Sequence, residues 1–420
     1  MNNSFYKVWF ARLISILGSS LTTFGVSVWV FEKTGKATPM AIVLLCTILP
    51  AILFAPISGI ICDSYNRKNI IIIADSFAAF TTLALFAYLA LGRYDFGVIC
   101  MFNFLNSTAN LFDSNAYQAS LSTLIEERYL KKANGMNQII DSVGSIIAPV
   151  CAGILYYPVG LKGLLCIDLI SYLLAMILFV GVPAHNFYEE SSLKPVFEKE
   201  KPQMSAGFSF IFNQRGLTLL MCFFAIFNFL MNIASSLTEP LALSISGSVA
   251  LGTVQMAGGI GIFFGSIYIT KHDIKLTYSF AIFCSACVAG LALLITGVGN
   301  HIAFMLIGQF LLLFVTPIVN TMAGTLWIIK TPKELQGRVY AARSMVSKCI
   351  VPVAYFIIGP VTDYLMPKFL SSENGLAILL SNSLGKGNLN YRCMYLLSGI
   401  IAIVCALLFF SRSSMKELGK

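Results

Sequence analysis

The residues with the clearest chemical potential are two carboxylic acids in otherwise apolar sequence. Asp113 lies in the run LFDSNAY, and Glu239 lies in ASSLTEP. Burial disfavours the charged form of a carboxylic acid, so such a group can take up and release protons near neutral pH. We therefore predict that Asp113 and Glu239 are proton-coupling groups. The alternative for both is a structural role, and Pro240 favours a helix end directly after Glu239.

Other ionisable residues compete for this role. Further acids within apolar runs have structural alternatives, because Asp75 and Asp141 could pair with Arg67 or Arg343 and Asp363 lies near the end of its apolar run. The histidines fall in or near loops, so an intramembrane proton relay would have to use carboxylates. The competing acids are Asp75, Asp141, Asp168 and Asp363, and the histidines are His185, His272 and His301.

Polar side chains recur at helical spacing around the two acids. Within 103–117, 228–239, 309–320 and 15–22 they follow one another at steps of three, four or seven, which places them on one helix face. Such a face either binds another helix or lines a water-filled cavity, and its recurrence in four segments favours the cavity. The predicted cavity residues are Asn103, Asn106, Asn110, Tyr117, Asn228, Asn232, Gln309 and Asn320, with Ser15, Ser19, Thr22, Ser235 and Thr316 on the same faces.

The elements that position these residues must be membrane-spanning helices. Of the 420 residues, 57% are hydrophobic and 11% are charged, and the mean hydropathy is +0.81, which is far too apolar for a soluble protein. Apolar runs of about 20 residues can cross a hydrocarbon core of roughly 30 Å as helices. We predict twelve spans: 9–31, 39–61, 70–91, 96–122, 136–157, 161–182, 217–241, 249–270, 276–297, 302–328, 341–366 and 391–411.

The charge distribution predicts the orientation of these spans. With a cytoplasmic amino terminus, most of the 28 Lys and Arg residues fall on the cytoplasmic side, which is the positive-inside pattern. This pattern explains the net charge of +9 without a nucleic-acid partner. Trp9 and Trp29 lie about 30 Å apart on a helix, as expected for two aromatic residues at opposite interfaces. Both termini are therefore predicted to be cytoplasmic.

The longest polar interruption divides the chain into two halves of six spans. We predict an amino-terminal half at 1–182, a cytoplasmic linker at 183–215 and a carboxyl-terminal half at 216–420. The segments IEERYLKKANGM and IIKTPKELQGRV follow the fourth and tenth spans and echo each other. Related halves are typical of transporters built from repeats.

Metal, disulfide and nucleotide chemistry find little support in the sequence. The eleven cysteines lie nearly all in spans, and the CSAC motif at 284–287 has no second ligand pair, so packing is favoured over metal binding. No phosphate-binding P-loop occurs, which argues against ATP as the direct driver. We expect no cofactor and no metal.

The loop GIICDSYNRKNII at 59–71 resembles the signature loop of the major facilitator superfamily. Its pattern G-x-x-x-D-x-x-x-R-K comprises Gly59, Asp63, Arg67 and Lys68 and stands between the second and third spans. The resemblance implies a gating loop that latches the two halves in the outward-facing state. The corresponding loop of the second half has Ile269 in place of the acid, which implies a one-sided latch.

Two further segments resemble exporters of the same superfamily. SVGSIIAPVCAG is similar to the antiporter motif of the fifth span, with Gly144, Pro149 and Gly153 as its residues, and implies close packing against the other half. The sequences FYKVWFARLISILGSS and GRVYAARSMVSKCIVP are similar to the branch of macrolide and enterobactin exporters. Asn106 stands where this family usually has an arginine in the fourth span, so a proton mechanism that uses that arginine is not carried over.

The resemblance implies an all-α membrane protein with the major facilitator fold, located in the bacterial inner membrane. It implies proton-coupled efflux of an amphipathic small molecule, such as a drug or a siderophore, by alternating access. The alternatives are uptake of a small nutrient on the same fold and an intramembrane transferase, for which no reactive cluster is found. We expect no enzymatic activity, a monomer, and a small-molecule substrate, protons and the lipid bilayer as partners.

Overall fold

The computed structural model describes residues 3–54, 57–58, 61–62, 65–125, 136–137, 139–140, 143–183, 204–271, 276–332, 335–372, 375–385, 387–413 and 415. Within these residues the chain is helical and has no strand. Eight helices of the described part are long and apolar enough to cross a membrane. The chain divides into two compact units, which are unit 1 (1–33 and 42–199) and unit 2 (34–41 and 200–420).

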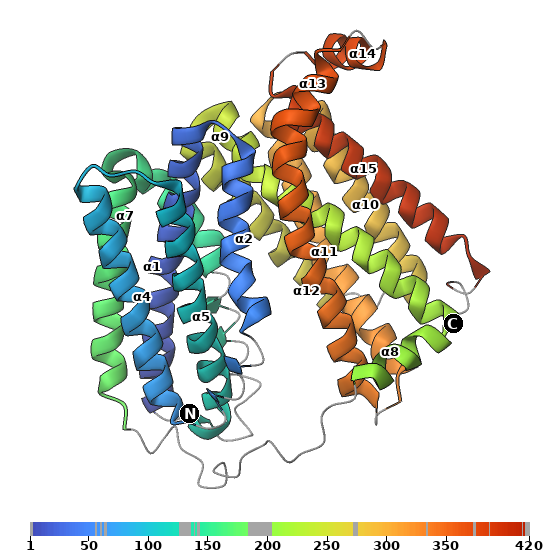
Figure 1. The fold of residues 1–420 in the computed structure, drawn as a ribbon. Helices are drawn as coiled ribbons and strands as arrows, with labels where there is room; N and C mark the ends of the chain where they lie inside the picture. Colours follow the sequence, from blue (N-terminus) through green and yellow to red (C-terminus); the bar gives the residue numbers. More distant parts are fainter. Residues whose placement is uncertain are drawn as a thin grey trace. The chain divides into compact units, whose positions relative to one another are not determined.

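Unit 1 is a bundle of long helices that run side by side (Figure 1). The side chain of Asn66 caps the amino terminus of α4, and Asp95 caps α5 by accepting a hydrogen bond of 2.7 Å from the backbone N–H of Gly97. Short polar loops therefore set where these helices begin. The helices are α1 (Asn3–Thr34), α2 (Ala37–Leu53), α4 (Arg67–Ala90), α5 (Phe96–Leu124), the π-helix η2 (Val143–Ile147) and α7 (Ala148–Val180).

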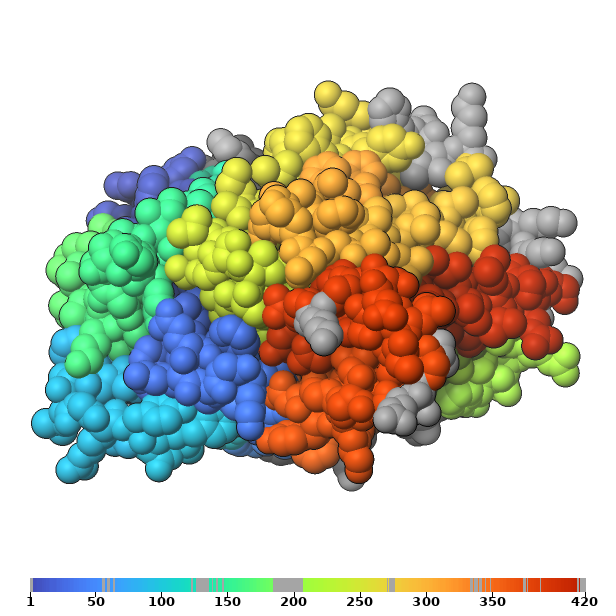
Figure 2. All heavy atoms as spheres, turned by 90° about the horizontal axis from the view of Figure 1, so that it is seen from above, coloured from blue at the N-terminus to red at the C-terminus, as the bar shows by residue number. Residues whose placement is uncertain are grey.

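Unit 2 is built around the helix pairs α9–α11, α10–α11 and α10–α15. In the view from above, the yellow and orange atoms of this group lie next to the red atoms of α15 (Figure 2). The predicted linker at 183–215 contains a helix, α8, which packs on α12. The helices are α8 (Met204–Asn213), α9 (Arg215–Lys271), α10 (Tyr278–Val298), α11 (Ile302–Lys330), α12 (Gln336–Pro360), the π-helix η7 (Val361–Leu365), α13 (Met366–Leu370), α14 (Gly375–Leu384) and α15 (Leu389–Phe410).

Two of the long helices contain a break in their helical backbone. Gly160 in α7 has φ 61°, and Gly247 in α9 has φ 74° directly after a non-helical Ser246. A positive φ is readily adopted only by glycine, so these residues set the position of each break. Both breaks fall between spans that the sequence predicts as separate, at 158–160 and 242–248.

The start of α2 is held by a residue from the other end of the sequence. The Asp363 carboxylate of η7 accepts hydrogen bonds from the backbone N–H groups of Ala37 (3.1 Å) and Thr38 (2.6 Å) and from the Thr38 hydroxyl (2.5 Å). A negative charge at a helix amino terminus satisfies otherwise unpaired N–H groups and interacts favourably with the helix dipole. Residues 34–41 consequently belong to unit 2.

A buried arginine binds the ends of two helices of unit 2, one of which is α14 (Figure 1). Arg392 is 1% exposed. Its guanidinium donates to the carbonyl oxygens of Gly297 (3.1 Å), Leu384 (2.8 Å) and Gly387 (3.3 Å) and to that of Val298. These carbonyls lie at or just past the ends of α10 and α14, where backbone acceptors lack helical partners. Arg392 therefore ties both helix ends to the start of α15.

Candidate functional site

A cavity of about 350 Å³ lies within unit 2 and is lined by α9, α10 and α11. Four of the predicted cavity residues meet here, and Ser235 and Thr316 from the same helix faces line it with them. The amide of Asn232 donates to the Asn228 backbone carbonyl (2.7 Å), and that of Asn228 is 3.5 Å from the Ser347 hydroxyl of α12. The four predicted residues are Asn228, Asn232, Gln309 and Asn320.

The remaining walls of this cavity are apolar and aromatic. Phe224, Phe227 and Met231 of α9 face Leu312, Leu313, Val315 and Val319 of α11. The guanidinium of Arg343 lies 5.9 Å from the Phe224 ring and 5.7 Å from the buried Trp327 ring. Both distances are within the range of cation–π contacts, so Arg343 contacts the ring of Phe224, which lines the cavity. A pocket of this size with a few polar groups on apolar walls is typical of small-molecule sites.

Glu239 does not line this cavity, although its spacing places it on the same face of α9. The cavity extends along α9 only from Phe224 to Ser235. Glu239 lies one turn beyond this end, where its charge acts on the Tyr355 hydroxyl of α12. The predicted polar face is thus longer than the cavity that it lines.

Asp113 forms an ion pair with Arg12 of α1 inside unit 1. The two side chains are 9% and 14% exposed, respectively. The guanidinium also lies over the ring of Tyr117, at 4.9 Å from its centroid. Opposite charges in close contact stabilise the ionised form of both groups, and the aromatic face adds a cation–π contact. Asp113 is therefore held as a carboxylate in this conformation.

Asp75 of α4 lies beside this ion pair. It lines a small void of about 20 Å³ together with Arg12, Asp113 and Tyr117, and the Arg12 charge acts on its carboxylate. A void of that size holds about one water molecule. Arg67, one of the partners considered for Asp75, donates to the Ala119 carbonyl oxygen at 2.7 Å.

The other predicted cavity residues of α5 bond within unit 1. Asn103 donates to the Ile99 carbonyl oxygen (2.8 Å) of its own helix, and Asn110 donates to the Asn106 side-chain oxygen (2.9 Å). The Tyr117 hydroxyl donates to Asn137 at 2.6 Å. These side chains form a polar face on α5 beside the Arg12–Asp113 pair. Their role in substrate binding stays a prediction.

The resemblance-based residues are placed only in part. Gly59 and Asp63 of the gating loop lie outside the described residues. Lys68 donates to the carbonyl oxygens of Val180 (3.1 Å) and Val182 (2.5 Å), so it ties the start of α4 to the end of α7. Together with the Arg67 contact, this shows both basic residues binding helix ends within unit 1.

The antiporter-like segment packs against the first helix. A methyl group on Gly144 of η2 would lie 3.0 Å from Ile16 and 3.3 Å from Ser20, so the missing side chain permits close approach of η2 to α1. Pro149 and Gly153 are buried at the start of α7. The predicted contact of this segment with the other half stays a prediction.

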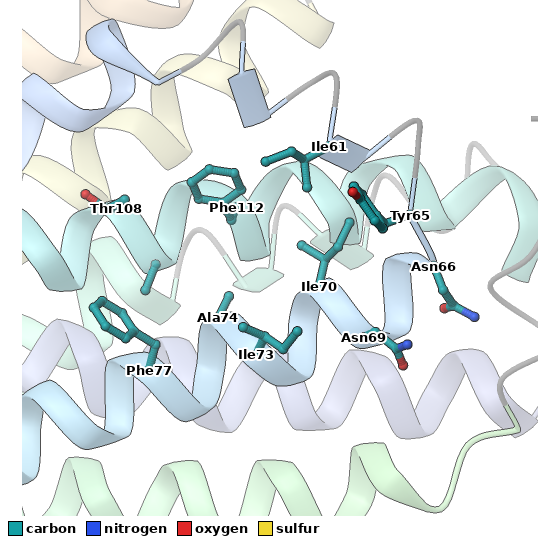
Figure 3. A pocket seen from close by; sticks show the side chains of 11 residues that line it. Ile61, Tyr65, Asn66, Asn69, Ile70, Ile73, Ala74, Phe77, Thr108 and Phe112 are labelled. Carbon is teal, nitrogen blue, oxygen red and sulfur yellow. The ribbon is translucent and has the colours of Figure 1, made fainter. Parts of the chain in front are cut away.

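A second, larger cavity of about 540 Å³ lies between α4 and α5 and differs in character (Figure 3). Ile70, Ile73 and Phe77 of α4 face Phe112 of α5 across it, and none of its lining side chains is charged. Ile73 is 68% exposed, as expected for a side chain that meets lipid. This groove suits the hydrocarbon chains of the surrounding bilayer, so the polar cavity of unit 2 is the stronger candidate for recognition.

Arg12 is the functional residue that the sequence reading misses. It lies within the first predicted span, where a charged side chain costs roughly 2.5–3.5 kcal/mol at the bilayer centre on insertion scales. A lone arginine inside a span is therefore a signal that it has a partner. The prediction for this helix instead concerned the polar face at 15–22, which begins one turn after Arg12.

Comparison with known proteins identifies the family. A model of the Major Facilitator Superfamily matches residues 8–354. Macrolide efflux protein A from Streptococcus pyogenes is 23% identical over 86% of this chain and 89% of its own, and its namesake from Enterococcus faecalis is 24% identical over 76% and 99%. A bacterial homologue of the human lysosomal transporter Spinster has the same fold, with a TM-score of 0.72 at 14% identity over 100% and 99% of the two chains. The chain therefore belongs to the major facilitator superfamily, as a multi-pass transporter of the bacterial inner membrane.

Proposed function

We propose that this transporter exports an amphipathic small molecule, most simply a macrolide or a compound of similar size and polarity, in exchange for protons. The observation that carries the proposal is the unit 2 cavity, which combines amide side chains with aromatic and aliphatic walls. Such walls adapt to apolar rings while a few amides fix polar substituents. The similarity to macrolide efflux proteins supports export over nutrient uptake. A siderophore is a second cargo of the same amphipathic kind.

The proposal includes the topology expected from the sequence. Twelve spans follow if α2 and α5 are added to the eight apolar helices and if α7 and α9 each count as two spans that meet at Gly160 and Gly247. The positive-inside charge pattern supports cytoplasmic termini. A monomer would work by alternating access, because ligands can shift an existing equilibrium between two conformations.

Asp113 is the proposed coupling group for protons. Among the described residues, Asp113 forms an ion pair with Arg12. Asp113 lies on the predicted polar face of α5. Protonation of Asp113 would neutralise the carboxylate, weaken its attraction to Arg12 and so favour a different arrangement of α1 and α5. Glu239 is the second candidate, at lower priority because it lies beyond the cavity.

Filling the unit 2 cavity should block transport. Thr316→Trp places an indole among the lining residues, and we expect it to lower the rate of radiolabelled erythromycin transport about tenfold or more, the equivalent of ~1.4 kcal/mol or more of lost binding. The matched control is Ile307→Trp on the same helix, since Ile307 is 52% exposed and does not line the cavity. Equal loss in both variants would mean that α11 tolerates no tryptophan and would remove the cavity argument.

Neutralising Asp113 should separate proton coupling from substrate movement. In proteoliposomes with an imposed pH gradient, wild-type protein is expected to drive erythromycin against its concentration gradient. Asp113→Asn is expected to lose this driven transport but to retain exchange of labelled for unlabelled erythromycin, because the substitution leaves the unit 2 cavity intact. Driven transport at the wild-type rate in Asp113→Asn would exclude Asp113 as the coupling group and direct the test to Glu239→Gln.

A further inference from the structure

A second acidic site lies in unit 1, away from the Arg12–Asp113 pair. Asp168 of α7 is fully buried, with 0% exposure. The Thr22 hydroxyl of α1 donates to its Oδ2 at 2.8 Å. Its Oδ1 points at Gly18 of α1, where a methyl group would lie 2.8 Å away, next to the Ser171 hydroxyl. No hydrogen bond of normal geometry reaches Oδ1 from the described residues.

The surroundings of Asp168 differ from those of Asp113 in charge. Asp113 touches a guanidinium, whereas the Asp168 side chain accepts a hydrogen bond from the Thr22 hydroxyl, and the Ser171 hydroxyl donates to the Asp168 backbone carbonyl oxygen (2.7 Å). An ionised carboxylate buried without a cation is strongly unfavourable, and it takes up a proton instead. In this conformation Asp113 is therefore the charged acid and Asp168 the neutral one. The bundle therefore holds one neutral acid, which can donate a proton, and one charged acid, which can accept one.

Tyr172 lies one helical turn after Asp168 on α7. It is 4% exposed and packs against Ala78 of α4 and Ala109 of α5. The ionisable side chains of Asp168, Asp75 and Arg12 lie close enough to interact electrostatically with its hydroxyl, from α7, α4 and α1, respectively. The Tyr172 hydroxyl forms no hydrogen bond of normal geometry to a described residue in this conformation. A phenol can accept one proton and donate another, so Tyr172 can connect Asp168 to Asp75 in a conformation in which its hydroxyl contacts both.

The two acidic sites lie at different depths in the membrane. Arg12 contacts the first site and Thr22 contacts the second, and both residues belong to α1. The ten helical residues from Arg12 to Thr22 correspond to about 15 Å, or half of the hydrocarbon core. With a cytoplasmic amino terminus, as proposed above, Arg12–Asp113 is near the inner surface and Asp168 is near the middle of the membrane, closer to the outer surface than the ion pair is. A proton that enters from outside meets Asp168 first.

We propose that Asp168, whose Oδ2 accepts a hydrogen bond from Thr22, is a second proton-binding site of this transporter and passes its proton through Tyr172 toward Asp75 and the Arg12–Asp113 pair. In the binding step a proton from water adds to Oδ1 of the carboxylate and gives a neutral carboxyl group. In the release step that proton moves from Oδ1 to the Tyr172 hydroxyl oxygen while the Tyr172 hydroxyl proton moves to the Asp75 carboxylate, so Tyr172 stays neutral and the Asp168 carboxylate keeps the hydrogen bond from Thr22. The role of Asp168 in transport rests on the proposed proton coupling, whereas the protonation of Asp168 does not depend on that proposal.

The direct test is infrared difference spectroscopy of the purified transporter in lipid, without any substrate, titrated from about pH 5 to 9. We expect a C=O stretching band of a protonated carboxyl that disappears as the pH rises, because Asp168 then releases its proton. The band should be missing in Asp168→Asn and unchanged in Asp95→Asn, which removes an exposed helix-capping carboxylate and replaces it with an equally good cap.

Three outcomes would overturn the proposal. The band could persist in Asp168→Asn, could be absent from the wild type, or could vanish in Asp168→Asn without having titrated in the wild type, which would mark a permanently neutral structural acid. If Asp168→Asn does not fold, Asp168→Glu and Thr22→Val replace it, and both should shift the midpoint of the titration. A midpoint unmoved in both variants would equally contradict the proposal.

A transport measurement then connects the site to coupling. Proteoliposomes with Asp168→Asn should show proton flux that is lower by at least about tenfold, while exchange of labelled erythromycin continues. Failure of erythromycin to move in the wild type would contradict the proposed substrate and would leave the infrared result standing. Wild-type proton flux in a folded Asp168→Asn variant would contradict the relay itself.

Discussion

Replacing Arg12 by methionine is expected to lower the free energy of unfolding by roughly 3–5 kcal/mol, because it leaves the Asp113 carboxylate buried without its partner. The tyrosine ring beneath the guanidinium would also lose its cation–π contact. The measurement is the thermal unfolding midpoint of the purified protein in detergent, with denaturant titration to obtain the free energy.

The double variant Arg12→Met/Asp113→Leu tests the reason for this loss. Replacing both members of a buried pair by apolar side chains removes the unpaired charge, so most of the wild-type stability should return. The double variant should still lack proton-driven transport. If it is as unstable as Arg12→Met alone, the loss comes from the packing of Arg12 rather than from the stranded carboxylate.

Gly265→Ala is expected to destabilise unit 2 by about 1–3 kcal/mol or more, although alanine is normally the better helix former. A methyl group at Gly265 would overlap the backbone carbonyl oxygen of Phe314, and one at Gly261 would overlap that of Phe310. Backbone atoms cannot rotate away as side chains do, so α9 and α11 would have to separate. The thermal unfolding midpoint should fall accordingly.

The matched control for this substitution is Gly324→Ala on α11. A methyl group at Gly324 would meet no atom within 4 Å. Alanine there removes only the conformational freedom of glycine, so we expect a gain of about 0.5–1 kcal/mol. Opposite signs for Gly265→Ala and Gly324→Ala would establish that the α9–α11 backbone contact limits the first position. A loss of similar size in both would point to helix bending by glycine instead.

Helix positions followed from the sequence because long apolar runs have few alternatives in a bilayer. The predicted spans 276–297 and 302–328 correspond to α10 (Tyr278–Val298) and α11 (Ile302–Lys330). The helix α8 was not predicted, because a ten-residue helix at the edge of a polar segment has no span-length hydrophobic signal. Short helices of this kind depend on packing, which local sequence does not reveal.

Side-chain partners were harder to predict than helix faces. Asn228 of α9 and Gln309 of α11, which lie on predicted polar faces of their helices, line one cavity of unit 2. The spacing could not show where that cavity ends, so Glu239 was included. Asp113 and Arg12 meet across two helices that the sequence does not align, and only the packed bundle identifies the pair.

The contact between Asp363 and the start of α2 has a consequence for biosynthesis. Thr38 and Asp363 are 325 residues apart in the chain. At about 5–20 residues per second, the ribosome needs roughly 16 to 65 s to reach the acid after it has made the helix start. Until then the N–H groups of Ala37 and Thr38 have to be satisfied by water or lipid headgroups. The turn between α1 and α2 is therefore the last part of the amino-terminal hairpin to be fixed.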